Sequence, residues 1–460
     1  MNFMRKMKRL IAIICAVILV AGCTGCGSAG NNNDTREKKN KEQSGTTPAE
    51  KQTDPTPTEK PSDPTPTGTP GSGDSKNLTA GSSGEAPATK AMDDKMRTAY
   101  ETFAYRLFDR MEKGSTRMIS PFSIYTALAM LGNGADAETL KQMDAMLGLT
   151  EDERNAYMAA WIAKLVGGSS DEAKFTNADS VWIKTALADS VPKEFLDICA
   201  KYYKAAVYST PMDATTVKDV NKWVEENTMG MIKEIIKQLS PEASMILMNA
   251  IALDAKWADP FDTESIRKDY TFTKENGTTK KVEMMFGEAN NGLLENELAT
   301  GFTKAYKGGE FSYVALLPKE GVSINQLVES LKPGLVKELW RTSRSGEVHI
   351  GLPKYKEEYT VTLNDALEQL GMVNAFDENT AEFGKLMDRS RGNTSVNTVL
   401  HKTFISVDNE GTKAAAVTAI IMDTCEAIGP QDVFYVTLDR PFVYMIVDAD
   451  GMPVFLGTYE

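Results

Sequence analysis

The chain has 460 residues, of which 25% are charged and 42% are hydrophobic, a composition typical of a globular protein with a large core. Its 51 basic and 64 acidic side chains give a net charge of −13, which repels nucleic-acid phosphates and argues against nucleic acid as a partner. The two histidines, His349 and His401, lie far apart in sequence, so a histidine-rich zinc site of ordinary local spacing is excluded, and we expect no metal and no other cofactor.

Residues 1–22 have the features of an export signal. A basic start precedes an apolar stretch that is short for a permanent membrane helix. The run Leu-Val-Ala-Gly-Cys that ends at Cys23 resembles the lipobox of bacterial lipoproteins. This resemblance implies that Cys23 is the lipidated N-terminus, anchored on the extracellular face of a bacterial cell membrane, with later release also open. The alternatives are cleavage after Gly22 or Gly27 without a lipid, and an uncleaved anchor.

Residues 23–91 differ sharply in composition from the rest of the chain. The sequence Asp-Pro-Thr-Pro-Thr occurs at residues 54–58 and again at 63–67, and a Gly/Ser-rich stretch follows. Few side chains there could contribute to a core, which predicts a disordered tether. The prolines favour extended polyproline II, which would hold the rest of the chain away from the membrane.

Residues 92–460 form one patterned block without a second linker, which predicts a single large domain. Apolar residues recur at steps of three and four from Tyr100 to Met111 and predict a helix. Helical patterns dominate the first half, and strand patterns dominate the second. We therefore expect an α+β fold with mainly antiparallel sheets. The predicted strands are residues 311–317, 348–352, 404–407, 433–438, 442–447 and 454–456.

Common catalytic motifs are absent from the sequence: there is no Gly-rich phosphate loop, no Gly-x-Ser-x-Gly and no His-Glu-x-x-His. The protein is therefore not expected to be an enzyme. Of its five cysteines, only Cys199 and Cys425 lie in the domain, so no disulfide framework is predicted. Cys199 has aliphatic neighbours on a predicted helix and is expected in the core.

The most informative segment is residues 409–432, which contains Cys425. Between its flanking strands it leaves about 25 residues exposed, longer than loops in compact domains usually are, and long exposed loops usually carry function. Small residues gather at its start, from Thr412 to Ala419. Ala, Val and Thr can be fully extended and fit between two existing strands, because their side chains clear both faces of a sheet.

The start of this segment, Gly411-Thr412-Lys413-Ala414-Ala415-Ala416, resembles the hinge of inhibitory serpins, and matching segments extend along nearly the whole of residues 92–460. The resemblance implies the serpin fold, in which N-terminal helices pack on large, mainly antiparallel sheets and a reactive loop is exposed. The other matching segments are residues 119–124, 127–131, 134–135, 221–224, 249–251, 256–257, 260–261, 316–318, 352–355, 370–372, 401–402, 440–442 and 455–457.

The resemblance assigns roles to five matched residues. A polar cluster beneath the central sheet, called the shutter, would consist of Ser120, Ser123, Asn249 and His401. Trp257 would lie at the breach, under the point where the loop enters the sheet. Simpler interpretations also fit, because His401 could be an ordinary core histidine and Trp257 an ordinary core aromatic residue.

The family mechanism is suicide inhibition. A target serine protease attacks the loop, forms a covalent acyl-enzyme, and is then distorted when the cut loop inserts into the sheet. Counting from the hinge places the reactive bond between Cys425 and Glu426, although residues 422–427 all remain candidates because the loop is longer than in animal members. Cys425 suits subtilisin-, elastase- or chymotrypsin-like targets. The alternative targets are papain-like cysteine proteases and an Asp-directed protease that cuts after Asp423.

Two positions depart from the inhibitory pattern. Asn409 stands where inhibitory relatives usually have Glu, and Val417 is larger than the usual Ala. Neither change obstructs strand formation. The competing function is a non-inhibitory serpin-like binding or adhesion module on the cell surface, but such relatives tend to carry bulky residues at the hinge. We therefore expect a monomeric inhibitor, whose exposed Cys425 thiol would make it sensitive to oxidation.

Overall fold

The computed structural model describes residues 74–82, 87–240, 243–388, 394–412 and 432–460. The chain divides into two units, residues 1–62 and 63–460, and every described residue belongs to the second unit. Among the helices of these ranges, none combines the length and the apolar composition that spanning a bilayer requires.

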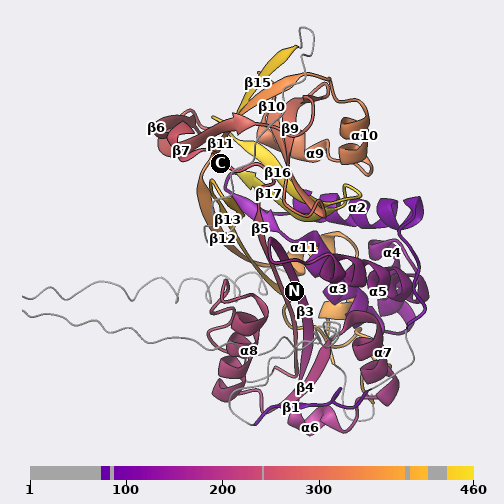
Figure 1. Cartoon of the computed structure of the whole chain (residues 1–460). Coiled ribbons are helices and arrows are strands. Elements are labelled where there is room, and N and C mark those ends of the chain that lie inside the picture. The colour runs from indigo at the N-terminus through magenta and orange to yellow at the C-terminus, as the bar shows by residue number, and fades with distance from the viewer. Residues whose placement is uncertain (1–73, 83–86, 241–242, 389–393, 413–431) are drawn as a thin grey trace, which may run out of the picture. The chain divides into compact units, whose positions relative to one another are not determined.

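Most of the helices lie in the first half of the domain, as the sequence predicts (Figure 1). The first begins at Asp94 and is capped by Asp93, whose side chain accepts a hydrogen bond from the backbone N–H of Met96 (2.9 Å). It buries the predicted apolar face, which confirms that helix. The helices are α2 (Asp94–Asp109), α3 (Pro121–Gly132), α4 (Ala137–Leu147), α5 (Glu151–Gly167), α6 (Thr185–Ala188), α7 (Lys193–Tyr203), α8 (Ala214–Asn227), α9 (Ile324–Glu329), α10 (Leu335–Arg341) and α11 (Asn364–Gln369), with 3₁₀ turns η1 (Thr263–Ser265) and η2 (Asn374–Phe376).

A seven-stranded sheet forms the centre of the domain. Its neighbouring strands are antiparallel except for β3 and β4, which are parallel. In spatial order the strands are β1 (Lys76–Asn77), β4 (Ala206–Thr210), β3 (Ala173–Lys184), β5 (Met245–Lys256), β14 (Gly411–Thr412), β13 (Leu400–Val407) and β12 (Tyr355–Thr362). The long β3 and β5 pair in continuous register from Ala173↔Ala255 to Ile183↔Met245.

Two further sheets complete the domain. The six-stranded sheet has the order β2 (Arg117–Ile119), β17 (Pro453–Tyr459), β16 (Phe442–Asp448), β10 (Phe311–Pro318), β9 (Ala299–Ala305) and β8 (Leu294–Glu295). The four-stranded sheet has the order β15 (Val433–Thr437), β11 (Glu347–Pro353), β7 (Thr279–Glu288) and β6 (Ile266–Thr273). All six predicted strands are present, and the expected α+β fold with mainly antiparallel sheets is confirmed.

Both faces of the seven-stranded sheet are covered. On β3, Val181 and Ile183 belong to the larger core, which includes residues of α3 and α5, whereas Trp182 packs with Trp223 of α8 in a second, smaller core. Figure 1 shows α3 and α5 on one side of this sheet and α8 on the other. Cys199 of α7 is fully buried, which confirms that it is a core residue.

The described part of the chain begins earlier than the predicted domain boundary at residue 92. Residues 74–82 fall within the expected tether, yet β1 pairs with β4 of the central sheet. The hydroxyl of Ser75 donates to the carboxylate of Asp219 (2.7 Å) and lies 3.0 Å from the hydroxyl of Thr210, with which it is hydrogen-bonded. This short segment is polar, so its composition did not reveal that its backbone adds an edge strand.

Candidate functional site

The first two hinge residues already lie inside the central sheet. Gly411 and Thr412 form β14, which pairs with β5 through Gly411↔Lys256 and Thr412↔Ala255, and with β13 through Val407↔Thr412. Both pairings are antiparallel. The segment expected to be exposed from residue 409 onward therefore begins as a short strand between two long ones.

The local sequence explains why these two residues fit there. A Cβ atom added to Gly411 would lie 2.2 Å from the carbonyl oxygen of Ala255, so only glycine allows this approach of the two backbones. Thr412 is buried, and its hydroxyl is hydrogen-bonded to the hydroxyl of Tyr306. A small polar side chain thus finds a partner inside the sheet.

A tight turn connects β13 to β14. The carboxylate of Asp408 accepts hydrogen bonds from the backbone N–H groups of Glu410 (2.9 Å) and Gly411 (3.2 Å). The carbonyl of Asn409 accepts from the backbone N–H of Phe261 (2.9 Å), and its side-chain amide donates to Glu410 (3.0 Å). Asn409, the departure from the inhibitory pattern, is therefore part of a hydrogen-bonded turn.

Trp257 lies directly beside this turn. Its indole N–H donates to the carbonyl of Asp408 and its backbone N–H to the carbonyl of Glu410, each at 2.8 Å. The ring is fully buried and stacks on Tyr306 with centroids 4.5 Å apart. Trp257 thus contacts both the turn and, through Tyr306, the side chain of Thr412. The assignment of Trp257 to the breach stays a prediction.

Lys304 of β9 is a buried cation close to this turn. It was not among the residues predicted from the sequence. Its ammonium lies 4.5 Å from the centroid of the Phe261 ring and donates to the carbonyl of Glu288 (3.2 Å). Burial, which disfavours the charged form, lowers the pKa of Lys304 to about 8.

The four shutter residues form one hydrogen-bonded chain, although they come from three separate parts of the sequence. The backbone N–H of Ser120 donates to Nε2 of His401 (3.0 Å), and the N–H of Ser123 donates to the hydroxyl of Ser120 (3.2 Å). The hydroxyl of Ser123 in turn donates to the side-chain oxygen of Asn249 on β5. His401 lies on β13, so the chain connects the two strands that flank β14.

His401 is neutral in this setting. It is almost fully buried, and burial lowers its pKa to about 3. Because Nε2 accepts a hydrogen bond, this nitrogen carries no proton. Hydrogen bonds of this kind can be exchanged for others when strands move, which a purely apolar contact cannot do.

The structure extends the chain to Asp179 of β3, which sequence reasoning missed. The side-chain N–H groups of Asn249 (2.5 Å) and Asn177 (2.9 Å) donate to its carboxyl group. Asp179 has no exposed surface, and burial raises its pKa to about 7, although both hydrogen bonds act in the opposite direction. A signal was present, since an acidic residue stands within an otherwise strand-like run that ends in Val181 and Trp182.

The remaining predicted site residues lie outside the described ranges. They are Cys23, Lys413, Ala414, Ala415, Ala416, Cys425 and Glu426. Their roles stay predictions. Within the described residues, the arrangement is a sheet whose strands β5 and β13 are joined by a strand of two residues at one end, with a polar chain connecting them farther along.

Such an arrangement can accept a longer strand. Residues that continued β14 in the same direction would pair antiparallel with both β5 and β13. The shutter hydrogen bonds would then exchange rather than be lost.

Comparison with known proteins agrees with this geometry. Residues 98–460 match the serpin (serine protease inhibitor) family. The chain is 31% identical to Serpin B8 of Homo sapiens over 369 residues, which is 77% of this chain and 96% of that protein. It is 29% identical to an uncharacterized serpin-like protein of Thermococcus kodakarensis over 366 residues, 78% of this chain and 84% of that protein.

Among solved structures, the fold is similar to that of the thermophilic serpin tengpin in its native state. The TM-score is 0.77 with 38% sequence identity, and the match covers 84% of this chain and 99% of tengpin. The latent state of tengpin matches with a TM-score of 0.69. The match over residues 98–460 and the similarity of the fold show that the chain belongs to the serpin family.

Proposed function

We propose that this chain is an inhibitory serpin that traps a serine protease as its acyl-enzyme. Membership of the serpin family implies protease inhibition in general. The observation that carries the inhibitory assignment is β14: the hinge enters between β5 and β13 in the direction that an inserted strand needs.

The proposed reaction follows serine protease chemistry as far as the first intermediate. The protease hydroxyl attacks the carbonyl of the residue before the cut bond, an ester forms, and the new amino terminus leaves. The cut loop then extends β14 along β5 and β13. The protease is displaced with it, and a shift of about 1 Å in its catalytic groups lowers the rate of deacylation roughly a hundredfold.

The target specificity follows from the residue before the cut bond. We assign the reactive bond to Cys425 and Glu426, with residues 422–427 as the range to be tested. A small uncharged side chain suits subtilisin-, elastase- or chymotrypsin-like proteases and gives trypsin-like enzymes no cation to bind. If Asp423 is instead the residue before the cut bond, an Asp-directed protease is the target.

The test is to mix the purified protein with subtilisin, pancreatic elastase and trypsin, and to analyse the products by denaturing gel and mass spectrometry. We expect a covalent complex with subtilisin or elastase and a released fragment that begins at Glu426. Faster inhibition of trypsin than of the other two would contradict the proposed specificity.

A matched pair of hinge variants separates inhibition from simple cleavage. Thr412→Arg puts a charged side chain at a buried position between two strands, so the loop should be cut without forming a complex. Thr412→Ser keeps the hydroxyl that reaches Tyr306 and should still form the complex. If the wild-type chain is cleaved without a complex by every protease tried, the non-inhibitory binding module becomes the better assignment.

We also propose that the protein acts from the outer surface of a bacterial cell, attached through a lipid on Cys23. The support is the sequence of residues 1–22 and the tether composition that follows. In a bacterial host fed radiolabelled palmitate, the wild-type chain should be labelled and Cys23→Ser should not. Labelling of the variant would show that the lipid is attached elsewhere.

A further inference from the structure

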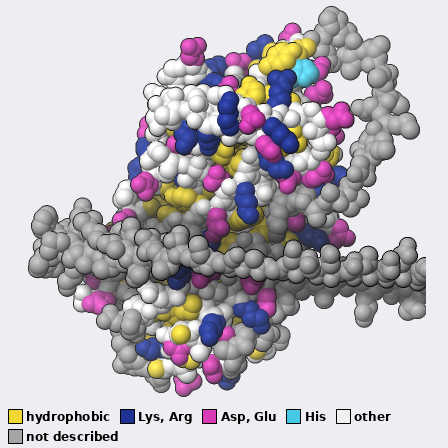
Figure 2. All heavy atoms as spheres, turned by 90° about the vertical axis from the view of Figure 1, so that its left-hand side faces the viewer, with side chains coloured by type: hydrophobic (Ala, Val, Ile, Leu, Met, Phe, Trp, Pro, Cys, Tyr) yellow, Lys and Arg dark blue, Asp and Glu magenta, His cyan; other side chains and the backbone are white. Residues whose placement is uncertain are grey.

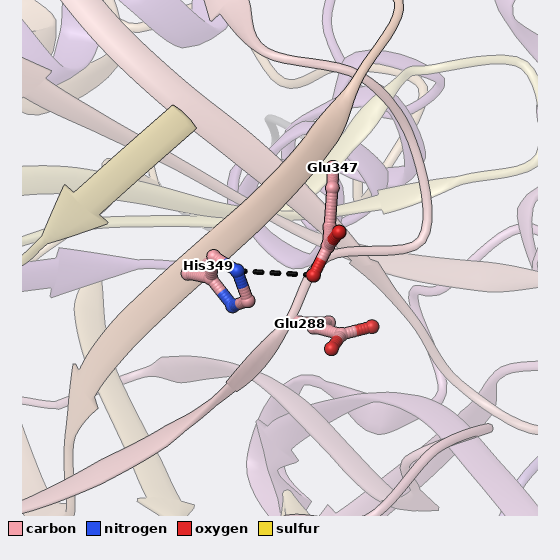
Figure 3. Close-up of side chains that lie close together, drawn as sticks. All are labelled: Glu288, Glu347 and His349. Carbon is pink, nitrogen blue, oxygen red and sulfur yellow. Dashed lines mark ion pairs between the residues drawn. The ribbon is translucent and has the colours of Figure 1, made fainter. Parts of the chain in front are cut away.

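Three potential metal ligands meet on one face of the four-stranded sheet. Glu347 and His349 are two residues apart on β11, so their side chains lie on the same face. Glu288 is the last residue of β7 and pairs directly with His349 in the register of the two strands. Figure 3 shows the imidazole of His349 and the carboxylate of Glu347 facing each other, with Glu288 beside them on the neighbouring strand.

The separations are compatible with a shared ion. One donor atom from each residue lies within 4.8 Å of the other two, and Nε2 of His349 is 3.0 Å from Oε1 of Glu347. Ligands at about 2.0–2.2 Å from a tetrahedral Zn²⁺ are roughly 3.4 Å apart. Small side-chain rotations would therefore bring all three donors to one ion without movement of the strands.

The two carboxylates make no direct ion pair with a described lysine or arginine, although the charge of Glu288 acts on nearby Lys304 and favours its protonated form. Lys304, the nearby buried cation, donates to the backbone carbonyl of Glu288 (3.2 Å) rather than to its carboxylate, and Arg344 pairs with Glu295 instead (3.2 Å). Two negative side chains beside one imidazole form a site where a divalent cation lowers the electrostatic repulsion.

The imidazole is also held in place from the other side. Tyr435 of β15 is opposite His349 in the parallel register, and the two rings stack with centroids 5.1 Å apart at an interplanar angle of 22°. Figure 2 shows a histidine side chain beside hydrophobic side chains near the upper edge of this face, with acidic side chains close by. His349 is partly exposed, whereas His401 is buried.

We propose that Glu288, Glu347 and His349 form a surface site for a divalent transition metal ion, with Zn²⁺ as the ion that best fits two carboxylate oxygens and one imidazole nitrogen. Water would complete the coordination. Magnesium and calcium prefer all-oxygen sites, so the imidazole disfavours them. A bound ion would connect β7 to β11 and fix the ring against which Tyr435 packs. This site is independent of the proposed inhibition.

The test uses the full chain, which contains only two histidines. Zinc chloride is titrated into protein labelled with ¹⁵N-histidine, and the ring resonances are followed by NMR while bound metal is counted after dialysis. We expect the resonances of His349 to shift until one equivalent is bound and those of buried His401 to stay unchanged. An unchanged His349 signal at saturating zinc would overturn the proposal.

Variants identify the ligands. His349→Asn, Glu288→Gln and Glu347→Gln should each weaken zinc binding at least tenfold, because each removes one of three protein ligands. Glu283→Gln changes an exposed carboxylate elsewhere on β7 and serves as the matched control, with unchanged binding expected. Undiminished binding by His349→Asn would assign the zinc to another part of the chain, such as its N-terminal cysteines, and would refute the site.

Thermal stability gives a second measurement. Zinc should raise the Tm of the wild type but not that of His349→Asn.

Discussion

At the scale of single residues, the buried carboxyl group of Asp179 predicts a pH-dependent stability. Burial raises its pKa from an ordinary 3.8 to about 7, so between these values the folded chain keeps a proton that the unfolded chain releases. The stabilisation that comes from keeping Asp179 protonated is complete below about pH 4 and is lost as the pH rises through 7. Asp179→Asn should remove this dependence, worth about 4 kcal/mol, and should raise Tm most at about pH 8.

The measurement is the difference in Tm between wild type and Asp179→Asn from about pH 5 to about pH 8. His401 contributes in the opposite sense, because its pKa is lowered to about 3 and its stabilisation is lost as the pH falls below about 6.5. Taking the difference between the two proteins cancels that contribution. Asp189→Asn, at an exposed position, is the control and should follow the wild type. Parallel curves for all three proteins would refute the assignment.

The residues of the candidate site show how much could be predicted from the sequence alone. Ser120, Ser123, Asn249 and His401 could be grouped in advance only because they match a family pattern, since they are scattered over nearly 300 positions. The local sequence marks Asp179 only as an acidic residue in a strand-like run, and the register of β3 and β5, which places it opposite Asn249, cannot be read from that run. The ligands Glu288 and His349 were missed for the same reason: sheet register, not spacing in the chain, brings them together.

At the scale of elements, β14 is held by a hydrogen bond that a single substitution can remove. Tyr306→Phe leaves the buried hydroxyl of Thr412 without its partner, which should destabilise the native state by about 1–3 kcal/mol. We expect faster amide hydrogen exchange in the peptide that contains residues 408–412, measured by mass spectrometry. This exchange reports directly on whether β14 has detached from β5.

A double-mutant cycle tests whether the hydrogen bond itself is the cause. Thr412→Val removes the other partner, so adding it to Tyr306→Phe replaces a buried unpaired hydroxyl with a methyl group. The double variant should therefore lose less stability than the sum of the two single variants. Additive losses would mean that the two hydroxyl groups are not coupled.

The elements also explain which parts of the fold were predictable. The six strands identified in the sequence are apolar runs bounded by proline or polar residues, and each one is present. The long strands β3 and β5 were not identified, because they are buried on both faces and lack an alternating pattern. A two-residue strand such as β14 has no pattern at all, and its position depends entirely on the strands around it.

At the scale of the whole molecule, the central sheet predicts that cleavage stabilises the protein. A cut within residues 413–431 would free the hinge to continue β14 along β5 and β13, and each new backbone hydrogen bond contributes about 1 kcal/mol net. A strand of ten or so residues would thus raise Tm by roughly 20 °C. The uncleaved state is then kinetically trapped, so its stability is set by a barrier.

This prediction is measured by calorimetry before and after limited cleavage with a protease that cuts within residues 413–431 but forms no complex. Thr412→Arg provides the control, because the cut chain cannot bury an arginine between the two strands and its Tm should stay near that of the uncut protein. Equal Tm values for cut and uncut wild type would show that the sheet accepts no further strand. The hinge would then be a fixed part of the fold, and inhibition by insertion would be excluded even if the loop is cut readily.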